Sequence, residues 1–168
     1  IVHSLSFLSY HSYKKIAKNF RFSEFTYSAK AAKYKIDNTP NEQEAANIVE
    51  LATKILQPIR DKYGKPIRIG SGFRCAKVNK IVGGSTSSQH MTGSAADINA
   101  YDDNGILFRI ILDMINNNEI TVGQLIWEFG NSVKPAWIHI SLPNAGKTNQ
   151  ILVAKKLSGK TYYFPYRE

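Results

Sequence analysis

Cysteine is almost absent from this 168-residue sequence. The single cysteine, Cys75, excludes an internal disulfide framework. We expect it to be a small buried residue, because no base is placed beside it to activate a thiol. No apolar run approaches the ~18 residues of a membrane-spanning helix, and the sequence has no internal repeats, low-complexity tracts or linkers. These absences, with a length sufficient for one sizeable core, favour a single domain without a membrane span.

Acidic residues are few compared with basic ones. The sequence has 13 Asp and Glu against 22 Lys and Arg, so its formal net charge is +9. Such a charge favours polyanionic partners. However, the basic residues are spread along the chain without a block of five or six like charges, and no nucleic-acid-binding motif is present. We therefore expect a solvated basic face and no nucleic-acid partner; docking on a polyanionic surface is the alternative.

The first 20 residues differ in composition from the rest, since they are rich in hydroxyl groups and then basic. We interpret residues 1–20 as an N-terminal appendage with a short helix over Tyr13–Asn19, and residues 21–168 as one domain. The appendage has no initiator Met and no basic n-region, so we expect no clear signal peptide in this chain.

Helical patterns dominate the first half of the sequence. A helix start is predicted at Phe22–Phe25, with Ser23 as its cap. After a break at 38–40, apolar residues recur every three or four positions, which predicts a long helix over Asn41–Tyr63. Pro58 should kink this helix or end its first part. Shorter helices are predicted over 75–82 and 106–116.

Strand patterns alternate with turns in the second half. The predicted strands are 67–74, 95–99, 124–129 and 136–142, and edge strands are expected at 151–153 and 161–164. Helices and antiparallel strands segregate along the chain rather than alternating strictly. The predicted fold class is therefore α+β.

Two stretches contain residues suited to metal chemistry. The first runs from Ser88 to Asp97, and the small residues before Asp97 allow the backbone to bring it together with His90. The second, Trp137–Ser141, alternates apolar and polar residues, so it predicts a strand with His139 on one face. Two histidines and a carboxylate are the ligands of a catalytic zinc that keeps a fourth position open for water.

The sequence has only four histidines. His3 and His11 lie in the appendage, where we expect them to be solvated. His90 and His139 have an alternative interpretation as hydrogen-bonded strand histidines without a metal. Their combination with Asp97 favours the ligand set.

The order of the motifs is specific. Ser-x-His-x-x-Gly-x-Ala-x-Asp, preceded by Ser-Gly-Phe-Arg and followed by Trp-x-His-x-Ser, resembles the zinc D-Ala-D-Ala carboxypeptidase family of peptidoglycan peptidases, in particular its bacterial and phage endolysin branch. The similarity extends upstream through Phe22–Phe25, Ile36–Pro40 and Leu56–Arg60, and covers roughly residues 20 to 142. It implies the hedgehog/DD-peptidase fold, in which an antiparallel sheet holds the metal and helices pack against it.

The resemblance also implies an activity. It predicts a zinc metallopeptidase, with one zinc ion bound by His90, Asp97 and His139, that hydrolyses a bond next to a D-amino acid in peptidoglycan stem peptides. Either a D-Ala-D-Ala carboxypeptidase or an endolysin-type endopeptidase fits. The expected place of action is the cell wall, reached as a periplasmic, extracellular or phage-delivered protein. Zinc would polarise the scissile carbonyl and lower the pKa of a bound water toward ~7.

The sequence departs from the family pattern at the catalytic acid. Many members have Asp or Glu three residues before the last histidine ligand, where this chain has Ala136. One interpretation is a non-catalytic, zinc-holding module that binds peptidoglycan or has a structural role. The other is that Glu128 replaces the missing acid, because its neighbours Trp127 and Phe129 should raise its pKa. Glu128 could instead pair with Arg74 or a lysine.

Three further residues are candidates for substrate contacts. The resemblance implies that Arg74 grips a terminal carboxylate or stabilises an oxyanion; a structural salt bridge is the alternative. Ser88 is expected to hydrogen-bond near the metal or substrate, or otherwise to its own backbone. Trp137 is expected in the core or in the wall of the substrate pocket. Asp102 and Asp103 are interpreted as turn residues.

Overall fold

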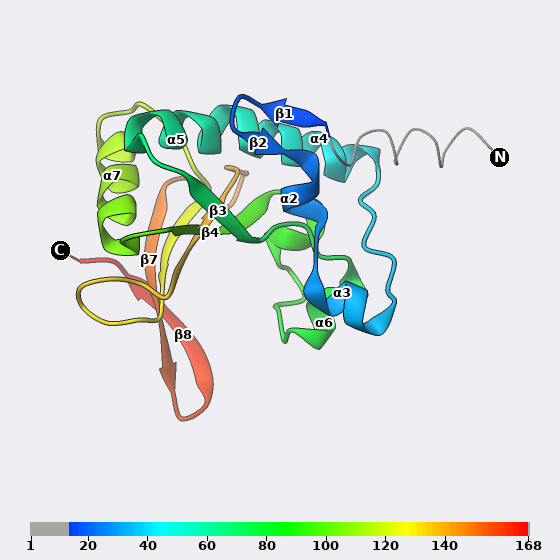
Figure 1. Cartoon of the computed structure of the whole chain (residues 1–168). Helices are drawn as coiled ribbons and strands as arrows, with labels where there is room; N and C mark the ends of the chain where they lie inside the picture. The colour runs from blue at the N-terminus through cyan, green and yellow to red at the C-terminus, as the bar shows by residue number, and fades with distance from the viewer. Residues whose placement is uncertain (1–13, 168) are drawn as a thin grey trace.

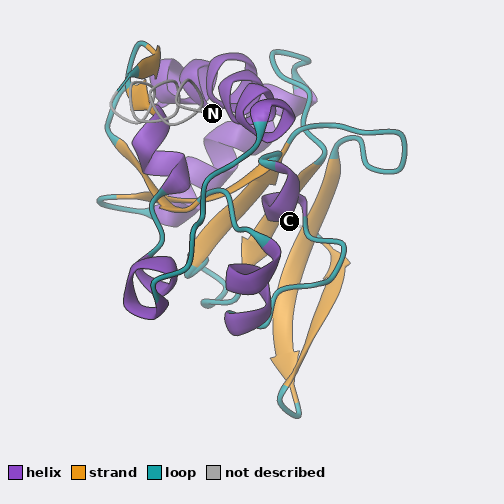
Figure 2. Cartoon of the chain, turned by 90° about the vertical axis from the view of Figure 1, so that its right-hand side faces the viewer, coloured by secondary structure: helices purple, strands orange, loops and turns teal. Residues whose placement is uncertain are grey.

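The computed structural model describes residues 14–167 (Figure 1). Its main sheet has six strands in the order β3-β4-β6-β5-β7-β8. These strands are β3 (Ile67–Ser71), β4 (Ala95–Ala100), β5 (Gln124–Glu128), β6 (Trp137–Ser141), β7 (Gln150–Leu157) and β8 (Lys160–Pro165). Helices cover one face of this sheet (Figure 2). The predicted α+β class is confirmed.

The sheet is mixed rather than wholly antiparallel. Strands β3, β4, β6 and β5 pair antiparallel, as expected for the strands with the predicted ligands. Strand β7, however, pairs with β5 in parallel. The reason is topological: β7 follows β6 after a loop and runs opposite to it, and the edge that remains free is that of β5. Strand β8 then pairs with β7 as an antiparallel hairpin.

The remaining elements precede or connect these strands. They are β1 (Lys15–Ala17), β2 (Phe20–Arg21), α2 (Phe22–Thr26), α3 (Ala29–Tyr34), α4 (Glu42–Leu51), the π-helix η1 (Ala52–Leu56), α5 (Gln57–Tyr63), α6 (Ala76–Ile81), the 3-10 helix η2 (Gln89–Thr92) and α7 (Asn104–Asn116). Asp103 caps α7 rather than forming only a turn, since its carboxylate accepts from the N–H of Gly105 at 2.7 Å. No helix among the described residues has the length and apolar character needed to cross a membrane.

The long predicted helix is present as the continuous run α4–η1–α5. Asn41 caps its start, because its side chain accepts from the N–H of Glu44 at 2.9 Å. Pro58, which lacks an N–H, is the second residue after the π-helical segment. The residue between them, Gln57, donates its N–H to the carbonyl of Ala52 five residues earlier. The widened turn accommodates Pro58 within the helical run.

The start of the described chain differs from the prediction. Residues 15–17 form β1, which pairs antiparallel with β2, so the predicted helix over Tyr13–Asn19 is wrong for its described part. The cause is burial: Phe20 is 1% exposed and its ring contacts Phe25 edge-on. An extended ladder can place this ring in the core. His3 and His11 lie outside the described residues.

The two faces of the main sheet have opposite character. Residues on one face are buried against the helices: Ile98 and Ile138 have no exposed surface, and the ring of Trp127 contacts that of Phe108 in α7 at a centroid distance of 5.1 Å. Because side chains alternate along a strand, the residues between them point to the other face. That second face presents Asp97 on β4, His139 on β6 and Glu128 on β5, and we call it the polar face.

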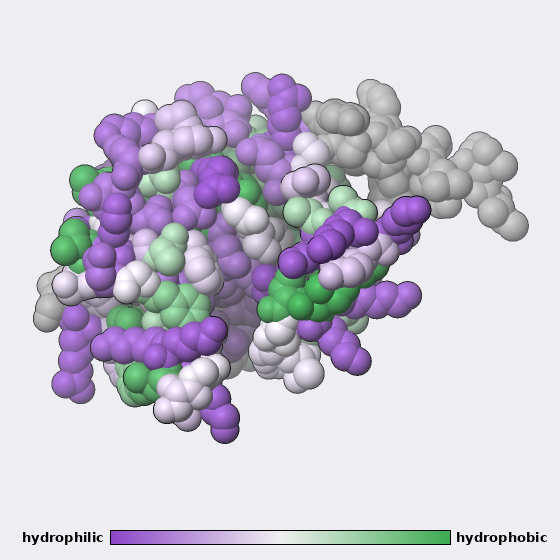
Figure 3. All heavy atoms as spheres, turned by 60° about the horizontal axis from the view of Figure 1, so that its bottom comes forward, coloured by the Kyte–Doolittle hydropathy of each residue, from purple (hydrophilic) through white to green (hydrophobic). Residues whose placement is uncertain are grey.

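A hollow lies over this polar face. Helices α3 and α6 contact each other and form one side of it, and the β7–β8 hairpin forms the other side (Figure 3). In the sheet order, β4, β6 and β5 lie between β3, which leads to α6, and the hairpin. The floor of the hollow is hydrophilic (Figure 3). We refer to this hollow as the cleft.

The backbone at Gly72 has no room for a side chain. A Cβ at this position would overlap the carbonyl of Phe25, to which the N–H of Phe73 donates at 2.6 Å. We predict that Gly72→Ala lowers the free energy of unfolding by about 1–3 kcal/mol through this overlap. Gly146→Ala is the control, since the nearest atom to a Cβ there is 3.8 Å away. Denaturant unfolding of both variants tests the prediction, and equal stabilities would contradict it.

Candidate metal centre

Three side chains meet on the polar face of the sheet. Asp97 on β4 pairs directly with His139 on β6, so both project from the same face. Nδ1 of His139 lies 3.1 Å from Oδ1 of Asp97, and Nε2 of His90, from η2, lies 3.3 Å from the same oxygen. The two ring nitrogens are 3.3 Å apart. The structure thus brings together the three predicted ligands, which we call the donor group.

A backbone carbonyl fixes the orientation of His90. Its Nδ1 lies 2.7 Å from the carbonyl oxygen of Gly72. Because a carbonyl only accepts, Nδ1 bears the hydrogen and Nε2 presents its lone pair to the donor group. The imidazole is also buried, with 2% of its residue exposed. Gly93, which lies between η2 and β4, has a positive φ of 71°, a conformation that glycine adopts readily. Because it has no Cβ, the chain can also pass close to the carbonyl of Glu44 before β4 begins.

The donor group has the spacing of a metal site. Tetrahedral ligands about 2.0–2.1 Å from a zinc ion are themselves about 3.3 Å apart. The separations of 3.1 and 3.3 Å observed here are close to this value. Burial alone raises the pKa of Asp97, but the imidazoles of His90 and His139 lower that pKa well below its ordinary range. The group therefore offers two nitrogens and an ionised carboxylate and could hold one metal ion.

Arg74 lies beside this group. Its Nη1 is 3.9 Å from Oδ2 of Asp97 and 3.3 Å from the hydroxyl of Ser71, to which it donates, and Nη2 donates to Ser88 at 3.5 Å. Burial lowers the pKa of the guanidinium, while Asp97 and Glu128 raise it. Its buried Nε has no partner among the described residues. The predicted salt bridge is thus long, and donors of Arg74 stay available.

The two other candidates for substrate contacts, Ser88 and Trp137, lie next to the donor group. The Ser88 hydroxyl accepts from the backbone N–H of His90 at 3.3 Å and from Arg74. The sequence analysis gave two alternatives for this hydroxyl, a hydrogen bond to the local backbone or one beside the metal or substrate. The hydroxyl makes a local backbone bond and also contacts Arg74 beside the donor group. Trp137 is partly exposed, and its ring packs edge-on against Phe129 at 5.2 Å. It lies on the polar face, two residues before His139.

Glu128 is a buried carboxyl on the same face. It is 7% exposed and pairs across strands with Trp137, two rungs away from His139 and on the same face of the sheet. Burial raises its pKa to about 7; His139 and Arg74 oppose this shift and Asp97 adds to it. No ion pair or side-chain hydrogen bond involves Glu128 within residues 14–167. The alternative of a structural pair with Arg74 or a lysine is not realised.

The position that lacks an acid lies beside Glu128. The backbone N–H of Ala136 donates to the carbonyl of Glu128 at 2.9 Å. The backbone of Glu128 on β5 is thus next to the position at which many family members have an acid. Sequence reasoning identified Glu128 from its apolar neighbours, and the predicted strands 124–129 and 136–142 indicated that it would lie on the strand beside that of His139. Sequence reasoning missed the role of Gly72, since a carbonyl acceptor leaves no side-chain signal.

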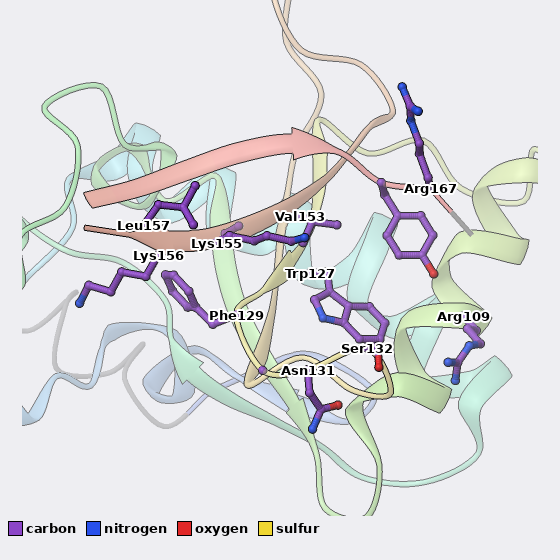
Figure 4. Close-up of a pocket in the computed structure, with 13 residues that line it drawn as sticks. Arg109, Trp127, Phe129, Asn131, Ser132, Val153, Lys155, Lys156, Leu157 and Arg167 are labelled. Atoms are coloured by element: carbon purple, nitrogen blue, oxygen red, sulfur yellow. The ribbon is translucent and has the colours of Figure 1, made fainter. Parts of the chain in front are cut away.

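A cavity larger than the surroundings of the donor group lies elsewhere in the described part of the chain. Its volume is about 1120 Å³, and it is lined by Arg109, Trp127, Val153, Lys155 and Arg167 among others (Figure 4). Trp127 and Val153 belong to the face of the sheet that packs against α7, opposite the donor group. A smaller cavity of about 580 Å³ is lined by Ser88 and Gln89, next to His90.

A convergent set of two imidazoles and a carboxylate, with a buried carboxyl of near-neutral pKa beside it, is suited to metal-assisted hydrolysis. The profile of the Peptidase M15 family matches residues 18–141, and the chain belongs to this family. A stretch of 46 residues is 48% identical to the zinc D-Ala-D-Ala carboxypeptidase of Streptomyces albus G. That stretch is 27% of this chain and 18% of the relative. The donor group, Arg74 and Glu128 all lie within the family match.

Glu128 makes stability depend on pH. Its pKa in the fold, about 7, exceeds the ordinary 4.5, so the folded state holds this proton more tightly than the unfolded state. Ionising Glu128 therefore destabilises the fold as pH rises from 4.5 through 7. We predict that metal-free Glu128→Gln gains stability relative to wild type over this range, by on the order of 2–3 kcal/mol. Denaturant unfolding of both proteins in chelator, at several pH values, tests this; a constant difference would contradict it.

Proposed function

We propose that this protein is a zinc metallopeptidase that hydrolyses a peptide bond next to a D-amino acid in peptidoglycan stem peptides. The main support is the convergence of His90, Asp97 and His139 at one point beside the unpaired carboxyl of Glu128. Membership of the Peptidase M15 family supports peptidase activity, and the name of the Streptomyces relative supports both zinc and a D-Ala-D-Ala substrate.

The proposal extends to the fold and the place of action. We assign residues 21–168 to one zinc peptidase-like domain of the hedgehog/DD-peptidase type. Residues 15–20 of the expected appendage of residues 1–20 pack onto this domain through β1 and Phe20. The antiparallel strands β4, β6 and β5 beneath the donor group support this assignment. The place of action would be the cell wall, for a carboxypeptidase or an endolysin-type endopeptidase.

In this mechanism, His90, Asp97 and His139 would hold one zinc ion, which would supply a Lewis acid for the scissile carbonyl and would lower the pKa of a bound water. Glu128 accepts the proton of the attacking water and transfers it to the leaving amine. A carboxyl whose pKa is close to neutral is suited to both transfers, because neither protonation state is strongly favoured.

Arg74 is the group that binds the substrate's carboxylate. Its guanidinium reaches the polar face between two hydroxyls, those of Ser71 and Ser88, and its closest acid is 3.9 Å away. A planar guanidinium forms two parallel hydrogen bonds to a carboxylate, which fixes the end of the peptide relative to the donor group. The free terminal carboxylate of a stem peptide has the required chemistry.

The second candidate function is a zinc-holding module that binds peptidoglycan without cleaving it, or that has a structural role. The alanine at position 136 favours this candidate. The buried carboxyl of Glu128 supports the enzyme, because its residue is joined to Ala136 by a backbone hydrogen bond and could take the role of the missing acid.

The test is mass spectrometry of purified stem peptides after incubation with zinc-loaded protein, beside a chelated control. We predict products that vanish with chelator and whose masses identify the cleaved bond. Glu128→Gln should lower kcat by about 10²–10⁴-fold while zinc content stays at one ion, because only the proton transfer is removed. His139→Ala should lose the zinc.

Two outcomes would contradict these assignments. An unchanged rate in Glu128→Gln would mean that another group is the base. An inert wild-type protein that gains cleavage on Ala136→Asp would identify a disabled enzyme and support the zinc-holding module.

A further inference from the structure

The β7–β8 hairpin extends the sheet on which the donor group lies. Strand β7 pairs with β5, which contains Glu128, and β8 is the outermost strand. The hairpin projects beyond the other strands (Figure 2) and forms one side of the cleft (Figure 3). Both strands lie outside residues 18–141, the part of the chain that matches the family. The hairpin is therefore a feature of this cleft that the family match does not explain.

One rung of the sheet connects the hairpin to Glu128. Glu128 pairs with Ala154 on β7, and Ala154 pairs with Tyr163 on β8. Paired residues on neighbouring strands project from the same face, so Tyr163 points to the polar face with Glu128 and His139. Two strand spacings separate the backbones of Glu128 and Tyr163 by about 10 Å. The fully buried methyl group of Ala154 is the only side chain between them on this rung.

The electrostatics of Tyr163 agree with this position. Partial burial raises the pKa of its phenol, and the charges of Glu128 and Asp97 raise it further. The hydroxyl therefore stays protonated at neutral pH and can donate a hydrogen bond. Within residues 14–167 no group accepts from it, and 54% of the residue is exposed. A donor on the cleft side thus remains available for a ligand.

We propose that Tyr163 binds the substrate peptide on the side opposite Arg74. Arg74 follows β3 and Tyr163 lies on β8, so the donor group and Glu128 are between them in the sheet order. If Arg74 holds the terminal carboxylate, the peptide crosses the strands and its acyl part reaches the hairpin. There the Tyr163 hydroxyl donates to a backbone carbonyl of the acyl part, and the ring packs against the peptide. This inference rests on the proposed function and deepens it, because it makes the hairpin select for the acyl side.

The hairpin itself supplies a matched control. Tyr162 is 46% exposed, close to the value for Tyr163, but it pairs with Lys155 and points to the opposite face. A phenylalanine at either position removes one hydroxyl from the same hairpin. Only Tyr163→Phe changes the cleft.

The experiment is steady-state kinetics of the full chain, loaded with zinc, on an N-acetylated tripeptide ending in D-Ala-D-Ala and on the dipeptide D-Ala-D-Ala. We expect Tyr163→Phe to raise KM for the tripeptide about tenfold, the loss of one hydrogen bond, with kcat changed less than about twofold. Tyr163→Ala should raise KM further. Tyr162→Phe should equal wild type, and the dipeptide should not distinguish the variants. Equal KM values for Tyr163→Phe and Tyr162→Phe would overturn the proposal.

A second measurement separates this proposal from the proposed function. Calorimetric binding of the tripeptide to zinc-loaded Glu128→Gln, with and without Tyr163→Phe, needs no turnover. About tenfold weaker binding of the double variant supports the role of Tyr163 even if the wild-type protein cleaves nothing. Equal affinities overturn it, and an absence of binding to either variant overturns both proposals.

Discussion

The carboxylate of Asp97 lies between two imidazoles on a sheet whose opposite face packs against the helices, and the arrangement of the site depends on this constraint. The pairing of Asp97 with His139 fixes the register of β4 and β6. A shift by one residue would expose Ile98 and Ile138 and bury both ligands. The hydrophobic core thus determines which side chains face the cleft. Because one register applies to the whole strand pair, it fixes the position of Asp97 and that of His139 together.

The parts of this site that are local in sequence were predictable. His90 and Asp97 are seven residues apart in a stretch of small residues, and His139 lies in a short alternating strand. The parts that depend on distant contacts were not. The parallel pairing of β7 with β5 follows from which sheet edge is free, and the ladder of β1 with β2 follows from the burial of Phe20. Neither leaves a periodic pattern in its own segment.

The closeness of Glu128 and Ala136 is a contact between neighbouring strands, which the predicted strands 124–129 and 136–142 already indicated. Eight residues separate them, yet one backbone hydrogen bond joins them across β5 and the start of β6. The backbones at the two positions are therefore close. Under the proposed function, Glu128 on β5 takes the role of the acid that is missing at position 136.

Gly72 gives the N-terminal segment a connection to the donor group. Its carbonyl receives the Nδ1–H of His90, and the next peptide N–H, that of Phe73, binds the carbonyl of Phe25 at the end of α2. A displacement of α2 would therefore reach the imidazole of His90 through the single peptide group between Gly72 and Phe73. Coupling free energies are reciprocal. If the contact with α2 strengthens the binding of an ion to the donor group, the bound ion stabilises that contact by the same free energy. The order of α2, which precedes all three residues of the donor group in the sequence, is in this sense coupled to the donor group.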